Sequence, residues 1–520
     1  MTSSLLPVLD VAALARAQRG PTAADKVARG ETVTVDAVVV GSGAGGAAAA
    51  RGLARAGLQV LVLEEGRRYT EKDFQGKKLP WSLLNLWRDR GVQSFEGPVI
   101  SLLPAGRVVG GSTVINSGIC FRATPERLVE WRAHAPWMTD ARMATLYDDV
   151  EKTIGVVETN PFIARKNNLT FLRGANALGL KHGFIRRNAP GCQGCGICHQ
   201  GCPSGGKWSV DKNYLAQAEE AGASVLPAAR VTTLRMEGRR CVGVDVDLLG
   251  PDDAVTGHAT IHAKYTVLAA GSIGTALILQ KNDVGTRSGH AGKNLAIHPA
   301  AVALAYFEED IQAWSGVPQG AWAEVPETPE VLLETQGLSA DVYYALLGKA
   351  GADGLAAMQR ANKLCSSGGM IRDRSVGEIR AGGDWRARIL YSLHEEDRQK
   401  LVLALRWLSK LKFAAGAVEV QPGVKGATLA RTVDEALAQI PEDLPATRFL
   451  HMHASHPMGT ARMTTDPAAG VVDPTGKVFD TTHLYVMDAA IFPSSLGVNP
   501  QMTIMAMASH LSELLASGKP

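Results

Sequence analysis

Four cysteines with metal-ligand spacing stand close together in this chain: Cys192, Cys195, Cys198 and Cys202. The spacing is C-x2-C-x2-C-x3-C, and Pro203 follows the last cysteine. Thiolates at this spacing are typical of iron–sulfur sites, since the short glycine-rich steps let backbone amides point at the sulfides. The run therefore predicts an iron–sulfur cluster. Because the fourth cysteine of such a run can serve a second cluster, and no second run exists here, both a three-iron (3Fe-4S) and a four-iron (4Fe-4S) form stay open.

Two other interpretations of the cysteine run also stay open. Compact zinc sites with four thiolates usually pair two C-x2-C steps across a longer span, so zinc is the less favoured metal. A loop without metal, either reduced or closed by a disulfide, is the third interpretation. The other cysteines, Cys120, Cys241 and Cys365, are isolated and are expected to be small buried side chains.

A second motif with chemistry lies near the N-terminus. A strand-like run at 35–40 leads into Gly41-Ser42-Gly43-Ala44-Gly45-Gly46, a small-residue helix at 47–56 and a second apolar run at 60–63 that ends at Glu64. Strand, G-x-G-x-x-G, helix, strand and acid together form the dinucleotide-binding fingerprint. The glycines permit a tight turn and close backbone approach to a pyrophosphate, the helix N-terminus attracts the phosphates, and Glu64 is placed to accept from a ribose hydroxyl. The motif alone does not separate FAD from NAD.

Length and composition limit the class of protein. A chain of 520 residues predicts two or more domains, and 46% hydrophobic with 20% charged residues is ordinary for a globular protein. A net charge of +3 gives no sign of a nucleic-acid partner. The longest segment without Asp, Glu, Lys or Arg, 489–512, is interrupted by prolines and polar residues, so no transmembrane segment is predicted. No signal peptide is recognisable, so a cytoplasmic location is expected, with a membrane-peripheral one as the alternative.

The pattern of expected elements predicts an α/β fold, α+β overall. Strand-like runs at 231–236, 242–248 and 265–268 follow the cysteine loop, and the last enters a second glycine turn and helix. Such a return to the dinucleotide domain is typical of a discontinuous Rossmann-like domain. Strand-like runs at 302–307 and 387–393 and an amphipathic helix at 395–415 indicate a sheet-plus-helix domain.

Six ordered motifs resemble the glucose–methanol–choline oxidoreductases, over nearly the whole chain after its N-terminal extension. The branch most resembled is that of bacterial long-chain alcohol oxidases and cholesterol oxidases. The motifs are the fingerprint at 41–46, Gly106-Arg107…Gly110-Gly111-Ser112-Thr113…Asn116, Ala269-Ala270-Gly271-Ser272, Gly292-Lys293-Asn294-Leu295…His298-Pro299, His456-Pro457-Met458-Gly459-Thr460, and Val486-Met487-Asp488-Ala489 with Asn499-Pro500…Thr503.

The resemblance implies site residues. His456 matches the active-site histidine and Asn499 its partner, while His298 is expected to fix a turn near the flavin. FAD is the implied cofactor, bound without a covalent link, because no histidine lies between Gly106 and Arg122. The cofactor-binding residues it implies are Gly41, Gly43, Ala44, Gly45, Gly46, Glu64, Glu65, Arg107, Gly110, Gly111, Ser112, Asn116, Val231, Ala270, Gly271, Asp488, Ala489, Asn499, Pro500 and Thr503.

The resemblance also implies a domain division. The expected parts are an N-terminal extension (1–32, with an amphipathic piece at 5–17), an FAD-binding domain in three parts (33–185, 208–297 and 451–520), a cysteine-rich loop (186–207) and a substrate domain (298–450).

The chemistry implied is oxidation of an alcohol. A hydride would pass from the carbon to flavin N5, His456 would take the hydroxyl proton, and Asn499 would hold the oxygen. A cluster at the cysteines would pass the electrons to an external acceptor or electron-transfer protein. The alternatives are an oxygen-using long-chain alcohol or sterol oxidase without a cluster, a sugar dehydrogenase, and an electron-transfer subunit without substrate chemistry. A largely apolar alcohol is the substrate expected by resemblance.

Overall fold

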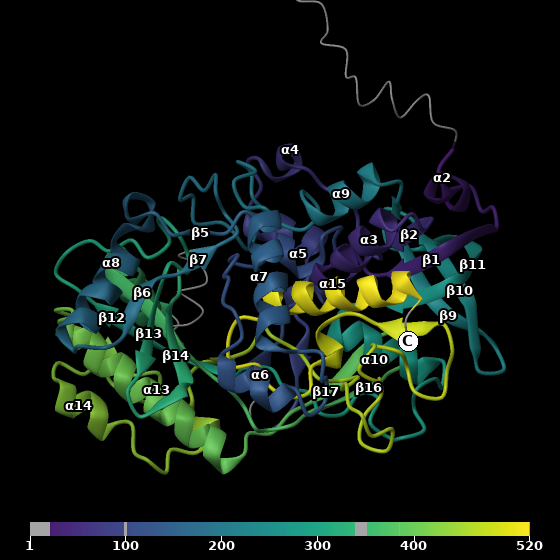
Figure 1. Cartoon of the computed structure of the whole chain (residues 1–520). Coiled ribbons are helices and arrows are strands. Elements are labelled where there is room, and N and C mark those ends of the chain that lie inside the picture. Colours follow the sequence, from purple (N-terminus) through teal and green to yellow (C-terminus); the bar gives the residue numbers. More distant parts are fainter. Residues whose placement is uncertain (1–20, 98–100, 338–350, 384, 519–520) are drawn as a thin grey trace, which may run out of the picture.

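A computed structural model describes residues 21–97, 101–337, 351–383 and 385–518 of the chain. Its strands gather into two main sheets, which lie on opposite sides of the view in Figure 1. The predicted amphipathic piece at 5–17 lies outside the described residues.

The first sheet is built from three separated stretches of chain. Its strand order is β8-β2-β1-β11-β10-β9, and β20 also pairs with β11. The pairs of β1 with β2 and β11, of β2 with β8, and of β11 with β20 are parallel, whereas β9, β10 and β11 form antiparallel ladders. The strands are β1 (Val33–Val40), β2 (Val60–Leu63), β8 (Ser224–Leu226), β9 (Ala229–Glu237), β10 (Arg240–Leu249), β11 (Val255–Leu268) and β20 (Leu484–Val486).

Helices from both ends of the chain pack beside this sheet. In Figure 1 the yellow α15 (Gln501–Ser517) crosses close to α3 (Ala44–Arg55) and α7 (Asp140–Ile154), and both contacts are present in the structure. The face of α3 is made of small residues, so helix and strands approach closely. Around them lie α2 (Ala23–Ala28), α9 (Tyr214–Glu220) and α10 (Gly271–Lys281).

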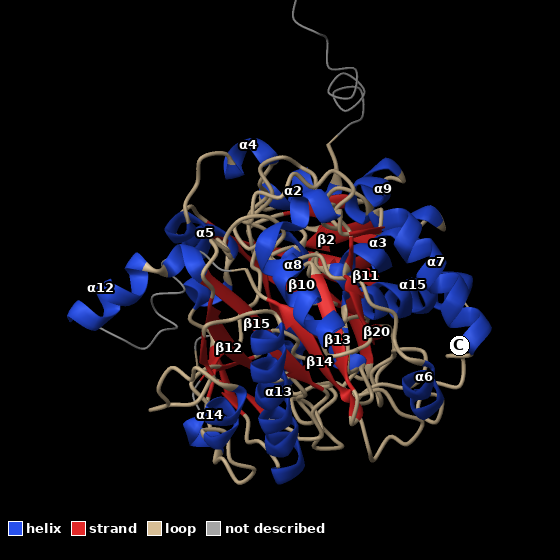
Figure 2. Cartoon of the chain, turned by 90° about the vertical axis from the view of Figure 1, so that its left-hand side faces the viewer, coloured by secondary structure: helices blue, strands red, loops and turns tan. Residues whose placement is uncertain are grey.

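The second sheet is antiparallel at every pairing, in the order β18-β12-β15-β14-β13-β6, with β19 on β12. All residues of β12 and β15 are buried, so both of their faces are covered. α13 (Glu395–Ala414) lies across these strands (Figure 2), and α8 (Pro161–Ala177) packs beside it. The strands are β6 (His182–Phe184), β12 (Ala300–Tyr306), β13 (Ala321–Val325), β14 (Thr328–Thr335), β15 (Leu364–Ile371), β18 (Glu419–Gln421) and β19 (Met452–His453).

Shorter elements connect the two sheets. The paired strands are β3 (Ser94–Phe95) with β4 (Ser101–Leu102), β5 (Val157–Glu158) with β7 (Arg186–Arg187), and β16 (Glu378–Ala381) with β17 (Ala387–Leu390). The remaining described α-helices are α4 (Glu71–Phe74), α5 (Leu79–Leu86), α6 (Pro125–Trp131), α12 (Gly351–Gln359) and α14 (Val433–Ala438). The cysteine run follows β7 as a loop, and α9 begins after it.

The predicted fold class is confirmed. The chain is α/β, with a Rossmann-like sheet drawn from distant segments and a separate sheet-plus-helix layer. The predicted strand at 302–307 is β12, and the predicted helix at 395–415 is α13. Among the described residues, no helix has both the length and the apolar character needed to cross a bilayer.

Candidate active site

A cavity of about 1290 Å³ is lined by residues of both sheets. Four parallel strands of the first sheet, β1, β2, β11 and β20, end at or next to it. The residues that follow them in the wall include Gly41, Glu64, Ala269 and Asp488. Ligands of open parallel sheets bind at these carboxyl ends. Val302, Met452 and His453 line the cavity from the second sheet.

The glycine turn after β1 forms one wall of the cavity. Gly41 has φ +102°, and a Cβ built on it would lie 2.3 Å from the carbonyl oxygen of Ala269. Gly43 is the N-cap residue of α3 and carries no side chain between the helix N-terminus and the cavity. Ala44 and Gly45 also line the cavity, whereas Gly46 packs against the carbonyl of Gly41. These features fit a dinucleotide, because unpaired N–H groups at a helix N-terminus bind phosphate.

Glu64 is buried at the end of β2 and is already hydrogen-bonded. Its Oε2 accepts from the hydroxyl of Ser42 at 2.6 Å and from the Ser42 N–H at 3.1 Å, and its Oε1 accepts from Gly66 N–H at 2.8 Å. Burial raises the pKa of Glu64, and the bond from Ser42 opposes that shift. The carboxyl lines the cavity and holds the glycine turn in place.

Glu65 is surrounded by arginines. Arg88 Nη2 lies 2.7 Å and Arg230 Nη2 3.0 Å from its carboxylate, and Arg107 Nε lies 3.2 Å away. Burial opposes ionisation of Glu65, but the three guanidinium groups outweigh it and lower its pKa to about 2. Arg107 also pairs with Asp253 at 2.7 Å and is not part of the cavity wall, whereas Glu65, Arg88 and Arg230 are.

The segment from Gly106 to Asn116 crosses the cavity beside the glycine turn. Gly111, Ser112 and Asn116 line the cavity, whereas Gly110 lies behind it and donates its N–H to the hydroxyl of Ser42 at 3.0 Å. The side chain of Asn116 donates to Gln501 Oε1 at 3.0 Å and accepts from Gly118 N–H at 3.0 Å.

The C-terminal motif meets the second glycine turn. Asp488 Oδ2 accepts from Gly271 N–H at 2.9 Å and from Thr275 Oγ1 at 2.6 Å, at the N-terminus of α10. Burial raises the pKa of Asp488 to about 6, although these hydrogen bonds favour the ionised carboxylate and so lower its pKa in part. Of the other predicted residues, Val231, Ala270, Gly271, Ala489 and Pro500 line the cavity, but Thr503 is buried against the hydroxyl of Tyr147.

The predicted pair His456 and Asn499 lines the same cavity as the glycine turn. Nδ1 of His298 lies 3.3 Å from Nδ1 of His456, and the Gly497 N–H donates to Nε2 of His298 at 2.8 Å. Burial, aided by His453, lowers the pKa of His456 to about 4. The imidazole of His456 is therefore neutral at physiological pH.

Asn499 is buried beside a carboxyl of the second sheet. Its Oδ1 has no hydrogen-bond partner among the described residues, while the side chain hydrogen-bonds to Glu334 on β14. Burial raises the pKa of Glu334 to about 8, and the bond from Asn499 lowers it only in part. Glu334 is therefore mainly protonated at neutral pH.

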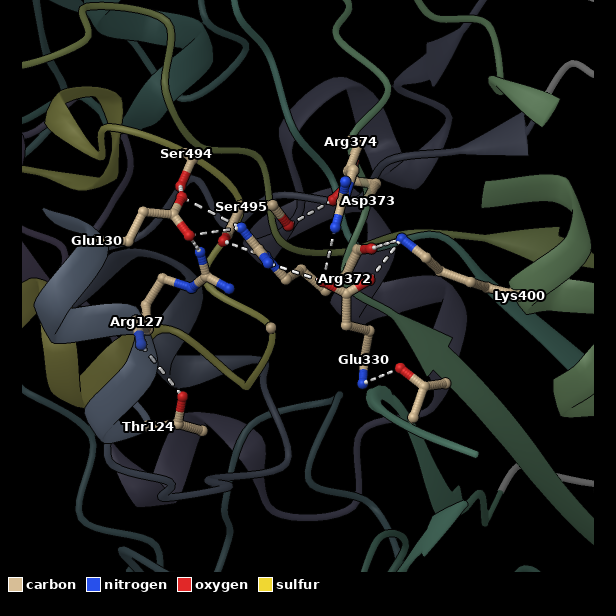
Figure 3. A network of polar contacts seen from close by, with 12 residues as sticks. Thr124, Arg127, Glu130, Glu330, Arg372, Asp373, Arg374, Lys400, Ser494 and Ser495 are labelled. Atoms are coloured by element: carbon tan, nitrogen blue, oxygen red, sulfur yellow. Dashed lines mark hydrogen bonds and ion pairs between the residues drawn. The ribbon is translucent and has the colours of Figure 1, made fainter. Parts of the chain in front are cut away.

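A buried polar network holds the segments that carry His298 and Asn499. Asp373 accepts from the N–H groups of Ile297 (2.9 Å) and His298 (3.3 Å), from the hydroxyl of Tyr391 (2.9 Å) and from that of Ser495 (2.6 Å). Figure 3 shows this carboxylate among charged side chains from α6, β14 and α13, with Ser494 and Ser495 on the chain that leads to Asn499. Arg372 pairs there with Glu330 at 2.7 Å and with Glu130 at 3.1 Å.

The four cysteines of the predicted metal site line one small second cavity. Cys198 is buried, Cys192 and Cys202 are half-buried, and Cys195 is exposed. None forms a disulfide with another described residue. Within the part of the chain that the structure describes, no three His, Cys, Asp or Glu side chains are grouped closely enough for a metal ion. The arrangement of the thiols thus shows no site for a single metal ion, and the iron–sulfur cluster stays a prediction.

Sequence reasoning missed several residues of this site. Arg88 and Arg230 had no local signal, because they meet Glu65 only in the fold. Glu334 did have one, since an acid ends the apolar run of β14 and acids are rarely buried without a partner. His298, expected to fix a turn, also contacts the ring of His456.

The fold and cavity define a dinucleotide-dependent oxidoreductase, and comparison with known proteins gives its family. The N- and C-terminal models of the GMC oxidoreductases match residues 35–300 and 373–508. The chain therefore belongs to the GMC oxidoreductase family and is an FAD-dependent oxidoreductase.

Relatives are similar over most of the chain. An uncharacterized GMC-type oxidoreductase of Mycobacterium tuberculosis is 39% identical over 92% of this chain and 75% of its own length. A long-chain-alcohol oxidase of Arabidopsis thaliana is 30% identical over 92% of this chain and 67% of its own. The crystal structure of pyridoxine 4-oxidase from Mesorbium loti shares the fold, with a TM-score of 0.69 at 19% identity, over 92% of this chain and 98% of that one.

Proposed function

We propose that this enzyme oxidises an alcohol to a carbonyl compound, with His456 as the base and Asn499 as the group that orients the hydroxyl. FAD, when bound, accepts the hydride of the alcohol carbon at flavin N5. The alcohol loses two electrons with that hydride and one proton from oxygen, and the proton goes to His456. The observation that carries the proposal is that the glycine turn, His456 and Asn499 line one cavity.

His456 has the properties that a base at this position needs. Its ring is neutral above about pH 4, so it has a free lone pair at the pH of the cell. His298 holds the ring through Nδ1, which leaves Nε2 as the atom that would receive the proton. Asn499 supports the same step because its amide N–H group would donate to the alcohol oxygen and so would not compete with His456 for the hydroxyl proton.

The cavity favours an apolar alcohol over a sugar. Its lining residues include Leu79, Leu83, Leu102, Phe449 and Leu450, and such apolar walls would leave several sugar hydroxyls without partners. Relatives named long-chain-alcohol oxidase and cholesterol oxidase point to the same substrate class. We therefore keep the sugar dehydrogenase only as the alternative.

The destination of the electrons is a separate proposal. We propose that they leave through an iron–sulfur cluster at Cys192, Cys195, Cys198 and Cys202 to an external one-electron carrier. Two observations support it: the four thiols line one cavity, and Cys195 lines the large cavity as well. A multinuclear cluster lies between its thiolates and holds them farther apart than a single ion does. Direct use of oxygen without a cluster is the alternative, favoured by the relatives named oxidases.

The domain division given above is also proposed, with the FAD-binding part in three segments (33–185, 208–297 and 451–520). Its support is the first sheet, whose strands come from all three. A cytoplasmic location stays a prediction.

The test of the chemistry is anaerobic reduction of the flavin by a panel of alcohols. We expect a long-chain or bulky apolar alcohol to bleach the FAD. His456→Asn should lower that rate by about 10²–10⁴-fold while FAD content is unchanged. His258→Asn is the matched control, because His258 lies on the surface and pairs with Asp247. Near-normal flavin reduction in His456→Asn would falsify the assignment of the base.

The test of the electron path is metal analysis of anaerobically purified protein. Iron and acid-labile sulfide should be present in stoichiometric amounts, and Cys198→Ser should lose them. Cys241→Ser, which changes a buried cysteine in the first sheet, should keep them. If neither element is found after reconstitution, oxygen becomes the favoured acceptor.

A further inference from the structure

Two buried cations stand at the cavity of the four thiols. Arg187 and Lys207 both line it, and each is only 2% exposed. Neither forms an ion pair with a carboxylate of the described residues, unlike most arginines of this chain. A buried charge is costly unless an opposite charge or several hydrogen bonds compensate it. The partners that these two cations do have therefore show what the cavity is built to hold.

Arg187 reaches two of the thiols. Its Nη2 lies 3.2 Å from Cys198 Sγ, and its Nη1 lies 3.7 Å from Cys192 Sγ. Its Nε donates to the carbonyl of Ser117 at 2.7 Å. A neutral thiol is a weak acceptor for a guanidinium group, whereas a thiolate is a charged one. This geometry suits sulfur atoms that carry negative charge.

Lys207 closes the cavity from the other side. Its ammonium group donates to the carbonyls of Val114 and Asn116, both at 2.7 Å, and to that of Cys198 at 3.1 Å. Its backbone N–H donates to Cys202 Sγ at 3.3 Å. The three carbonyls fill the donor capacity of the ammonium. No carboxylate of the described residues forms an ion pair with it, and the carboxyl of Asp211 attracts it only from farther away.

The same two cations tie the thiol cavity to the large one. Asn116 and Ser117, whose carbonyls they bind, line the large cavity, and Cys195 and Gly196 line both. His199 of the cysteine loop adds a contact, with Nε2 3.0 Å from the hydroxyl of Ser117. The loop is therefore fixed against the segment that runs beside the cofactor.

We propose that Arg187 and Lys207 hold the negative charge of an iron–sulfur group ligated by the four cysteines, and that Arg187 sets its reduction potential. This inference rests on the proposed electron path. A positive charge and N–H donors at the sulfurs favour the reduced, more negative form, so they raise the potential. The site thus recognises an anionic, thiolate-ligated metal group rather than a neutral thiol loop.

The experiment is a redox titration of the purified protein, followed by electron paramagnetic resonance, with iron and sulfide measured on the same samples. Arg187→Met should lower the midpoint potential by at least about 59 mV, which is tenfold in the equilibrium constant of a one-electron couple, or should release the iron while FAD stays bound. Arg187→Lys keeps the charge and should stay closer to the unchanged protein. Lys412→Met is the control, because it removes a buried lysine of α13 whose ammonium group donates to the hydroxyl of Ser367 on β15.

The outcomes separate this inference from the electron path on which it rests. Absence of iron from the unchanged protein, or zinc in its place, overturns both. A second outcome is that the unchanged protein contains iron, and that Arg187→Met keeps that iron and has the same midpoint potential as Lys412→Met. That result would show that the role proposed for Arg187 is wrong, while the iron–sulfur cluster itself would be supported. If Arg187→Met does not fold, the iron content and the midpoint potential of Lys207→Met are measured instead and interpreted in the same way. Reduction of FAD by alcohol tests the oxidation chemistry independently of all these variants.

Discussion

The two sides of the large cavity are built in different ways. On the first sheet, main chain faces the cofactor: the glycine turn after β1 and the helix N-termini of α3 and α10 line the wall. On the side of the second sheet, side chains form the wall. His298 and Glu334 hold two of them, His456 and Asn499, in place. A substitution disrupts the main-chain wall by adding atoms to it. A substitution disrupts the side-chain wall by removing a hydrogen bond or changing a charge.

The largest effect is expected where a side chain is added to the main-chain wall. Gly41→Ala puts a Cβ 2.3 Å from the carbonyl oxygen of Ala269, at φ +102°. We expect less than about a tenth of the normal FAD content, measured by flavin absorbance, because the turn must move. Gly57→Ala is the control, since φ is +88° there but nothing lies within 4 Å of the new atom. Its cost should be about 1 kcal/mol, with FAD retained. Normal FAD in Gly41→Ala would contradict the main-chain account.

An intermediate effect is expected from one lost hydrogen bond in the side-chain wall. Ser495→Ala removes the 2.6 Å hydroxyl bond to the buried carboxylate of Asp373. Chemical denaturation should show a loss of about 1.5–3 kcal/mol, as for bonds to charged groups. Because Ser495 leads to Asn499, kcat should fall as well. Ser288→Ala, whose hydroxyl accepts one N–H at 3.3 Å, should cost less than about 0.5 kcal/mol. Equal losses of unfolding free energy in the two variants would show that the hydrogen bond from Ser495 to Asp373 has no special importance.

The smallest effect is expected at pH 5 from Glu334→Gln, which replaces a protonated acid by an amide of similar shape. The folded pKa is raised from the ordinary 4.5 to about 8, so the folded state keeps a proton that the unfolded chain releases between these values. The free energy of unfolding should therefore fall as pH rises through this window and level off above it. Glu334→Gln should lack that fall when denaturation is followed from pH 5 to 8. A parallel decline in both proteins would show that Glu334 does not cause it.

The same contrast explains what could be predicted from the sequence. The turn at 41–46 and the second turn at 269–274 are local patterns, and both line the cavity in the structure. His456 and Asn499 were predicted from a resemblance, because they lie 43 residues apart and no local pattern joins them. Arg88, Arg230, Asp373 and Glu334 act through partners far away in the chain, and a single sequence contains no signal for such pairs. The cysteine spacing predicted an iron–sulfur cluster, which stays a prediction, but it contains no signal that Arg187 and Lys207 are buried beside the thiols.

The arginines around Glu65 have one more consequence. Among the described residues, Arg88, Arg107 and Arg230 form ion pairs only with Glu65 and Asp253, and burial raises the pKa of the nearby Glu64, so positive charge is left over at this end of the cavity. The diphosphate of bound FAD would neutralise this charge. Because FAD would then bind the folded protein and not the unfolded chain, its binding should stabilise the fold by mass action. Free FAD at a hundred times its dissociation constant would add about 2.7 kcal/mol, and the melting temperature would climb as FAD is titrated in. Preparations that lose their yellow colour should thus also be the first to aggregate on warming.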